Sequence, residues 1–68
     1  MRLHLSKLPT LTAKEAEKIL FALGFLLIRS KGSHRIYSRN SDRIVIPFHS
    51  GKNLHPKIVK SVLDLLED

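Results

Sequence analysis

The residues best suited to chemistry in this 68-residue chain lie together in the segment Lys31-Gly32-Ser33-His34-Arg35. Imidazole titrates near neutral pH, so His34 can accept or donate a proton in a reaction. The flanking cations, Lys31 and Arg35, can hold a phosphate and stabilise the charge that develops on it. Because RNA carries its own nucleophile, the 2′-hydroxyl, this segment indicates phosphodiester cleavage without a metal. The alternative is that His34 is a half-exposed strand residue with no catalytic role.

A second candidate is the His-Ser-Gly-Lys stretch at residues 49–52, just before a predicted helix. Free backbone amides at a helix N-terminus favour anions, so His49 and Lys52 could meet a phosphate there. The alternative is an ordinary polar turn. We therefore expect an RNA-binding set made of the following residues: Lys31, Gly32, Ser33, Arg35, His49 and Lys52.

Other chemistry finds less support in the sequence. His55 precedes a proline and is expected to belong to a helix cap, while His4 is expected to be inert. A Ser-His-Asp triad can be written from Ser33, His34 and Asp42, but nothing supports its geometry. The chain has no cysteine, no metal-site histidine spacing and no Gly-rich phosphate loop, so we expect no metal and no cofactor.

Two helices and three strands must position these residues. Thr12 and Glu15 have the spacing of a capping box, and Gly24 suits a helix C-terminus, so a helix is predicted over 13–23. Pro56 and a helical apolar stripe predict a second helix over 56–66. Between them, short β-rich segments separated by turn residues are the predicted strands: 25–29, 34–38 and 43–46. This order predicts a two-layer α+β domain, with both helices on one face of an antiparallel sheet.

The direction of His34 depends on the alternation of side chains along its strand. If Ile36 points to the core, His34 points there too, whereas an inward Tyr37 places His34 toward solvent. Tyr37 itself has two readings: it could stack an RNA base beside Arg35 and Arg39, or it could be a core tyrosine.

Composition narrows the class of protein. Lys and Arg number 12 against 6 acids, giving a net charge of +6, so a polyanion is the leading partner class. An apolar fraction of 43% is typical of a globular protein, and the length suits one domain over residues 1–68. No apolar run is long enough for a membrane helix, and no export signal is recognised, so we expect a cytoplasmic protein without membrane contact.

Several motifs together resemble the HicA toxins of type II toxin–antitoxin pairs. They are Leu8-Pro9, Leu23-Gly24-Phe25, Lys31-Gly32-Ser33-His34, Ile46-Pro47-Phe48-His49, Leu54 and the Val62-Leu63 helix. The resemblance covers about residues 7–66, with residues 1–6 as a short N-terminal extension. It implies a double-stranded-RNA-binding-domain-like fold, a metal-independent mRNA interferase (an endoribonuclease) with His34 as the catalytic residue, and a HicB antitoxin as partner.

The sequence thus predicts a toxin that cleaves mRNA and is covered by an acidic antitoxin surface laid over three cations: Arg35, Arg39 and Lys52. One alternative is a non-catalytic RNA-binding module of the same fold. Another is a basic domain that binds only protein. Cleavage that requires His34 distinguishes the first reading from the other two.

Overall fold

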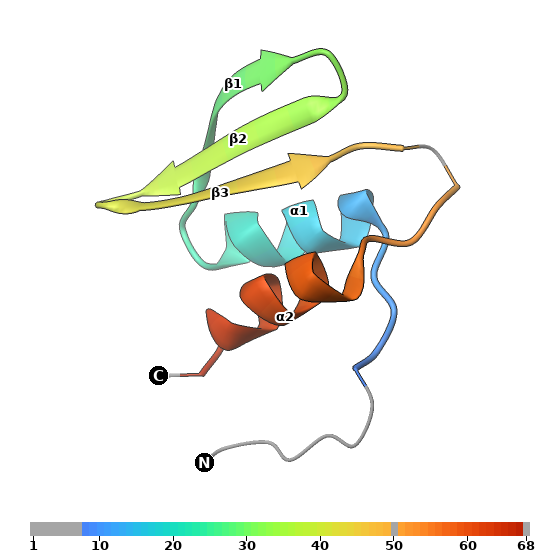
Figure 1. Cartoon of the computed structure of the whole chain (residues 1–68). Coiled ribbons are helices and arrows are strands. Elements are labelled where there is room, and N and C mark those ends of the chain that lie inside the picture. The colour runs from blue at the N-terminus through green and yellow to red at the C-terminus, as the bar shows by residue number, and fades with distance from the viewer. Residues whose placement is uncertain (1–7, 50, 68) are drawn as a thin grey trace.

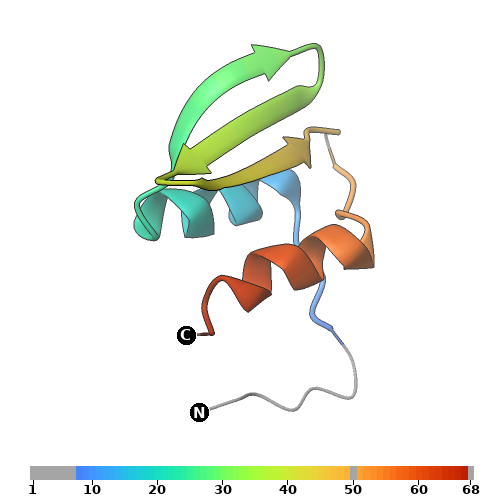
Figure 2. The ribbon, with the colours of Figure 1, turned by 60° about the vertical axis from the view of Figure 1, so that its left-hand side comes forward.

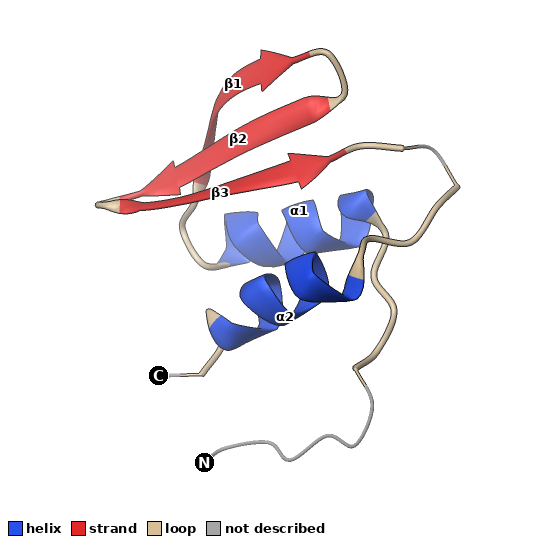
Figure 3. Cartoon of the chain, viewed as in Figure 1, coloured by secondary structure: helices blue, strands red, loops and turns tan. Residues whose placement is uncertain are grey.

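The computed structural model describes residues 8–49 and 51–67 as an α+β domain. The elements follow the order α1 (Ala13–Ala22), β1 (Leu26–Lys31), β2 (His34–Arg39), β3 (Asp42–Pro47) and α2 (Pro56–Asp64). Both helices lie on one side of the sheet (Figures 1 and 3). The fold class and the helix–sheet–helix order predicted from the sequence are confirmed.

The first helix begins at the predicted capping box. The Glu15 amide donates to the Thr12 hydroxyl, and the Thr12 amide donates to the Glu15 carboxylate at 2.9 Å. Leu23 is the C-cap, and Gly24 follows with φ +93°, the left-handed conformation that ends the helix. The next amide, of Phe25, donates to the carbonyl of Leu20 at 2.9 Å, so the chain turns back toward the sheet.

The three strands form an antiparallel sheet in the order β1-β2-β3. The register of the first pair is irregular, because Leu27 pairs with Tyr37 while Arg29 pairs with Ile36. Ile28 is therefore an extra residue, a β-bulge in an edge strand. The second pair is regular and runs from the His34–Pro47 pair to the Arg39–Asp42 pair.

The core lies between the sheet and the helices. Its fully buried members come from α1, the α1–β1 connection, β2, β3 and α2: Ala16, Leu20, Phe25, Tyr37, Ile46, Val59 and Val62. The view turned by 60° shows that the opposite face of the sheet is covered by no described element (Figure 2). No helix among the described residues is long and apolar enough to cross a membrane.

Most of the predicted boundaries shift by one or two residues, and three of these shifts have a clear physical reason. β1 begins at Leu26, because Phe25 is buried in the core rather than paired. β3 reaches Pro47, which is tolerated because the last residue of an edge strand needs no amide donor. α2 ends at Asp64, and the next two residues form a turn held by i→i+3 hydrogen bonds.

Candidate functional site

One end of the domain gathers the two segments that the sequence marked for phosphate chemistry, residues 31–35 and 49–52. The β1–β2 turn, the loop after β3 and the N-terminal ends of both helices all lie at the right of Figure 1. The amide of Phe48 donates to the carbonyl of Ser33 at 2.6 Å, which joins the loop to the turn. The amide of Leu54 donates to the carbonyl of Leu11 at 2.7 Å, which joins the end of the loop to the segment before α1.

His34 lies at the start of β2 and faces away from the helices. Tyr37 is fully buried between sheet and helices, so alternation along β2 directs His34, Ile36 and Ser38 to the opposite face. The side chain of His34 is exposed. The two directions that the sequence left open for His34 are thereby decided in favour of solvent.

A tight turn fixes the position of His34 relative to Lys31. These two residues pair across the β1–β2 hairpin, with only Gly32 and Ser33 between them. Gly32 has φ +58° and Ser33 has a negative φ, the combination found at the centre of a type II′ hairpin turn. Side chains of such a cross-strand pair stand about 5 Å apart at their Cβ atoms, so a cation lies beside the imidazole.

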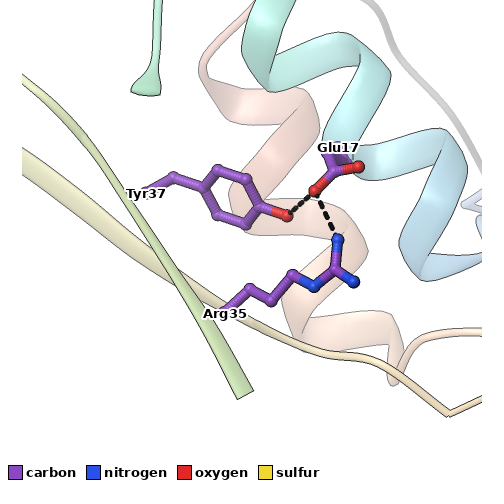
Figure 4. Close-up of polar contacts among 3 residues, drawn as sticks. All are labelled: Glu17, Arg35 and Tyr37. Atoms are coloured by element: carbon purple, nitrogen blue, oxygen red, sulfur yellow. Dashed lines mark hydrogen bonds and ion pairs between the residues drawn. The ribbon is translucent and has the colours of Figure 1, made fainter. Parts of the chain in front are cut away.

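Arg35 points the other way, into the helix layer. Its guanidinium donates to the carboxylate of Glu17 in α1 at 3.0 Å and lies over the ring of Phe48, 4.0 Å from the centroid. The hydroxyl of Tyr37 donates to the same carboxylate oxygen (Figure 4). Because the Phe48 amide is bonded to Ser33, this cluster ties α1 to the backbone beside His34.

Glu17 is the residue that sequence reasoning missed. It lies 18 residues from Arg35 and 20 from Tyr37, so no local pattern links the three. Burial, followed by the hydrogen bond to Glu17, raises the pKa of Tyr37 well above its ordinary value. Of the two readings of Tyr37, the core tyrosine is correct, because a fully buried ring cannot stack a base.

Arg39 is also directed into the helix layer. It donates to the carbonyl of Leu23 at 2.9 Å, lies over the ring of Phe25 and pairs with Asp42 at 3.4 Å. Arg35 and Arg39 are thus both paired on the helix side of the sheet, and the partner surface expected over them and Lys52 stays a prediction. Asp42, the first residue of β3, pairs with Arg39 at the end of β2 that is far from His34, which also separates the members of the Ser-His-Asp triad written from the sequence.

The loop after β3 carries the second candidate set. His49 and Lys52 are exposed, and the amide of Lys52 donates to the carbonyl of His49 at 3.1 Å, which closes a turn containing Gly51 at φ +73°. Ser50 and His4 lie outside the described residues. His55 is the N-cap of α2: its Nδ1 accepts from the amide of Lys57 at 3.1 Å, so its predicted capping role is confirmed.

The described residues contain no group of three His, Asp or Glu side chains close enough to hold a metal ion. The site is instead a cationic end of the molecule with two histidines near one joined pair of loops. Exposed His34 beside Lys31, with Lys52 on the neighbouring loop, can bind a phosphodiester and exchange a proton with it.

Comparison with known proteins agrees with this arrangement. A family model described as the HicA toxin of bacterial toxin–antitoxin systems matches residues 13–67. The chain belongs to the HicA toxin family. The matched range includes both candidate loops and every helix and strand of the domain. No curated protein and no solved structure matches the chain.

Membership in the HicA family gives the chain a biological setting. The family is that of toxins in bacterial toxin–antitoxin systems, which implies an antitoxin partner and RNA as the target in general. The roles of individual residues do not follow from the match, and they rest on the geometry described above.

Proposed function

We propose that this HicA toxin is an endoribonuclease that cleaves mRNA in the cytoplasm by metal-independent acid–base catalysis, with His34 as the catalytic residue. The observation that carries the proposal is the exposed His34–Lys31 pair at the β1–β2 turn, joined to the cationic loop after β3. The antitoxin that restrains it is proposed to be of the HicB type.

In the proposed reaction, His34 accepts the proton of an RNA 2′-hydroxyl. The 2′-oxygen forms a bond to phosphorus, the bond from phosphorus to the 5′-oxygen breaks, and that oxygen takes up a proton from His49 or water. The products are a 2′,3′-cyclic phosphate and a 5′-hydroxyl end. Lys31 stabilises the charge on the phosphate oxygens, and the exposed Lys52 binds a neighbouring phosphate.

The other residues of the predicted RNA-binding set position the catalytic histidine and the loops. Gly32 and Ser33 form the tight turn that holds Lys31 beside His34. Arg35 is already paired with Glu17 and stacked on Phe48, so in this proposal it positions the loop and leaves phosphate binding to the lysines.

The test is His34→Ala, assayed for RNA cleavage in the presence of a chelator. A positioned acid–base group contributes about 10²–10⁴-fold in rate, so we expect a loss of that size with RNA affinity and melting temperature retained. His55→Ala is the matched control, because it removes another exposed histidine and affects only a helix cap. Cleavage by His34→Ala at the parent rate would overturn the assignment.

His49→Ala decides the origin of the second proton. A loss comparable to that of His34→Ala indicates a two-histidine mechanism, and a mild loss leaves the leaving-group proton to water. If the wild-type protein binds RNA in a salt-sensitive way yet cleaves none, the chain is the non-catalytic RNA-binding module instead.

A further inference from the structure

The loop after β3 begins as a continuation of the sheet. In the β2–β3 register His34 pairs with Pro47, so the next pair along the two strands is Ser33 with Phe48. The amide of Phe48 donates to the carbonyl of Ser33 at 2.6 Å, which is a hydrogen bond that this pairing requires. The ladder therefore extends one residue beyond the end of β3, and it holds the chain directly before His49.

Phe48 and His49 point to opposite sides of this extension. Ile46 is fully buried on the helix side of the sheet, and Phe48, two residues further on, packs against the core from the same side. Side chains alternate along an extended chain, so His49 is directed to the other face, as His34 is. The side chain of His49 is exposed. The two histidines thus share the face of the sheet that lies away from the helices.

Sheet geometry sets the separation of the two imidazoles. His49 lies two residues beyond Pro47, the partner of His34, and such diagonal neighbours stand about 7–8 Å apart. That separation leaves room for one phosphate between the rings, with each ring at a hydrogen-bond distance of about 3 Å from one of its oxygens. Cleavage with a separate base and acid needs one imidazole on either side of the phosphorus.

The ring of Phe48 is held on one side by a cation. The guanidinium of Arg35 lies 4.0 Å from the centroid of the ring, and the carboxylate of Glu17 fixes that guanidinium at 3.0 Å (Figure 4). A guanidinium over an aromatic face is attracted by the π-electrons of the ring. Because Glu17 belongs to α1, this contact anchors the start of the loop to the helix layer and adds to the ladder hydrogen bond at Phe48.

We infer that Phe48 is a positioning residue for RNA cleavage: its ring, held under Arg35, fixes His49 beside His34 as the acid of the reaction. The inference rests on the proposed function and assigns its second proton transfer. As the bond from phosphorus to the 5′-oxygen breaks, His49 donates its proton to that oxygen, while His34 accepts the proton of the attacking 2′-hydroxyl. Each imidazole then regains its starting state by exchanging a proton with water.

The test removes the ring of Phe48 but keeps an apolar side chain in its place. Phe48→Leu takes away the π-electrons under Arg35, and Phe48→Tyr keeps them. Arg35→Met removes the guanidinium instead, so the contact is tested even if one variant does not fold. Phe21→Leu is the matched control, because Phe21 is 47% exposed on α1 and its ring packs against Tyr37 rather than against the loop. Urea unfolding is measured for every variant.

The kinetic readout compares each variant with and without His49. We expect Phe48→Leu, like Arg35→Met, to lower kcat for RNA cleavage about 10- to 100-fold, the effect of displacing a catalytic group by about 1 Å, with KM changed less than about threefold. Phe48→Tyr should keep most of the rate. In the His49→Ala background, Phe48→Leu should have no further effect, because a residue that acts through His49 has nothing left to position. Phe21→Leu should leave kcat unchanged in both backgrounds.

A second readout does not depend on cleavage. The backbone amide at position 48 is bonded to Ser33, so it should exchange its hydrogen with water slowly in the wild-type chain. Phe48→Leu should speed this exchange about tenfold, on the order of a lost cation–π contact, while Phe48→Tyr and Phe21→Leu should leave it slow.

Three results would overturn the inference. Phe48→Leu lowers kcat equally with and without His49, which makes its effect structural; His49→Ala barely changes kcat, which leaves the acid role to water; or exchange at position 48 is the same in Phe48→Leu and the wild-type chain. A wild-type chain that cleaves no RNA overturns the proposed function and the acid role together. Cleavage by the wild-type chain with unchanged exchange in Phe48→Leu overturns the inference alone.

Discussion

Glu17 offers the sharpest test of how the site is held in place. Its carboxylate accepts hydrogen bonds from both Arg35 and Tyr37, and Tyr37 is fully buried. We therefore expect Glu17→Ala to destabilise the domain mainly by leaving the Tyr37 hydroxyl buried without a partner. That loss costs about 1–3 kcal/mol.

The ion pair adds little to this cost. The side chain of Arg35 is 39% exposed, so solvent screens its attraction to Glu17, and a contribution of about 0.5 kcal/mol is the most we assign to it. The expected total for Glu17→Ala is about 2 kcal/mol. In a domain of this size that is a fall in melting temperature of about 8–16 °C.

The assay is urea unfolding followed by circular dichroism, in a double-mutant cycle with Tyr37→Phe. In the Tyr37→Phe background there is no buried hydroxyl for Glu17→Ala to leave without a partner. Glu17→Ala should therefore lower the free energy of unfolding by only about 0.5 kcal/mol in that background. Lys18→Ala, an exposed change on the same helix, is the control. Equal costs of Glu17→Ala in the two backgrounds would refute the role given to the hydroxyl.

Three further predictions concern the same end of the domain. Burial and Glu17 raise the pKa of Tyr37, so above about pH 10 the folded chain keeps a proton that the unfolded chain releases, and the free energy of unfolding falls by about 1.4 kcal/mol per pH unit. In unfolding curves measured at alkaline pH, Tyr37→Phe should show a shallower fall in stability than the wild-type chain. Identical curves for the two proteins would contradict the raised pKa. Gly32→Ala should lower the free energy of unfolding by about 1–2 kcal/mol through its φ of +58° alone, since a Cβ there meets no atom within 4 Å. An unchanged free energy of unfolding, measured in urea, would show that the turn adopts another conformation without cost. Lys52→Ala should lower the log–log salt slope of single-stranded RNA affinity by about 0.7, measured by fluorescence anisotropy, and an unchanged slope would remove Lys52 from the RNA contact set.

Local signals in the sequence predicted the elements well because each signal acts within a few residues. The Thr12–Glu15 capping box starts α1, Gly24 ends it, and Pro56 opens α2, as expected. The Gly32-Ser33 turn likewise lies where the turn chemistry placed it.

Contacts between segments that are distant in the sequence could not be predicted from one sequence. The directions of Arg35 and Arg39 depend on partners supplied by α1 and the residues after it, and only the folded register decides that Tyr37 points inward. The candidate site was found in part: the turn and the loop could be marked as separate motifs, but the bond from Phe48 to Ser33 that joins them could not.

The bulge at Ile28 has a consequence for the fate of the toxin when it is alone. β1 is an edge strand whose Leu26, Leu27 and Ile28 are all 40% exposed or more, the kind of strand that recruits other strands and starts aggregation. The extra residue bends that edge out of register, and Arg29 and Lys31 add charge to its far half, as gatekeeper residues do. A chain without Ile28 would present a straight apolar edge, so this single irregularity helps keep an unpartnered toxin in solution.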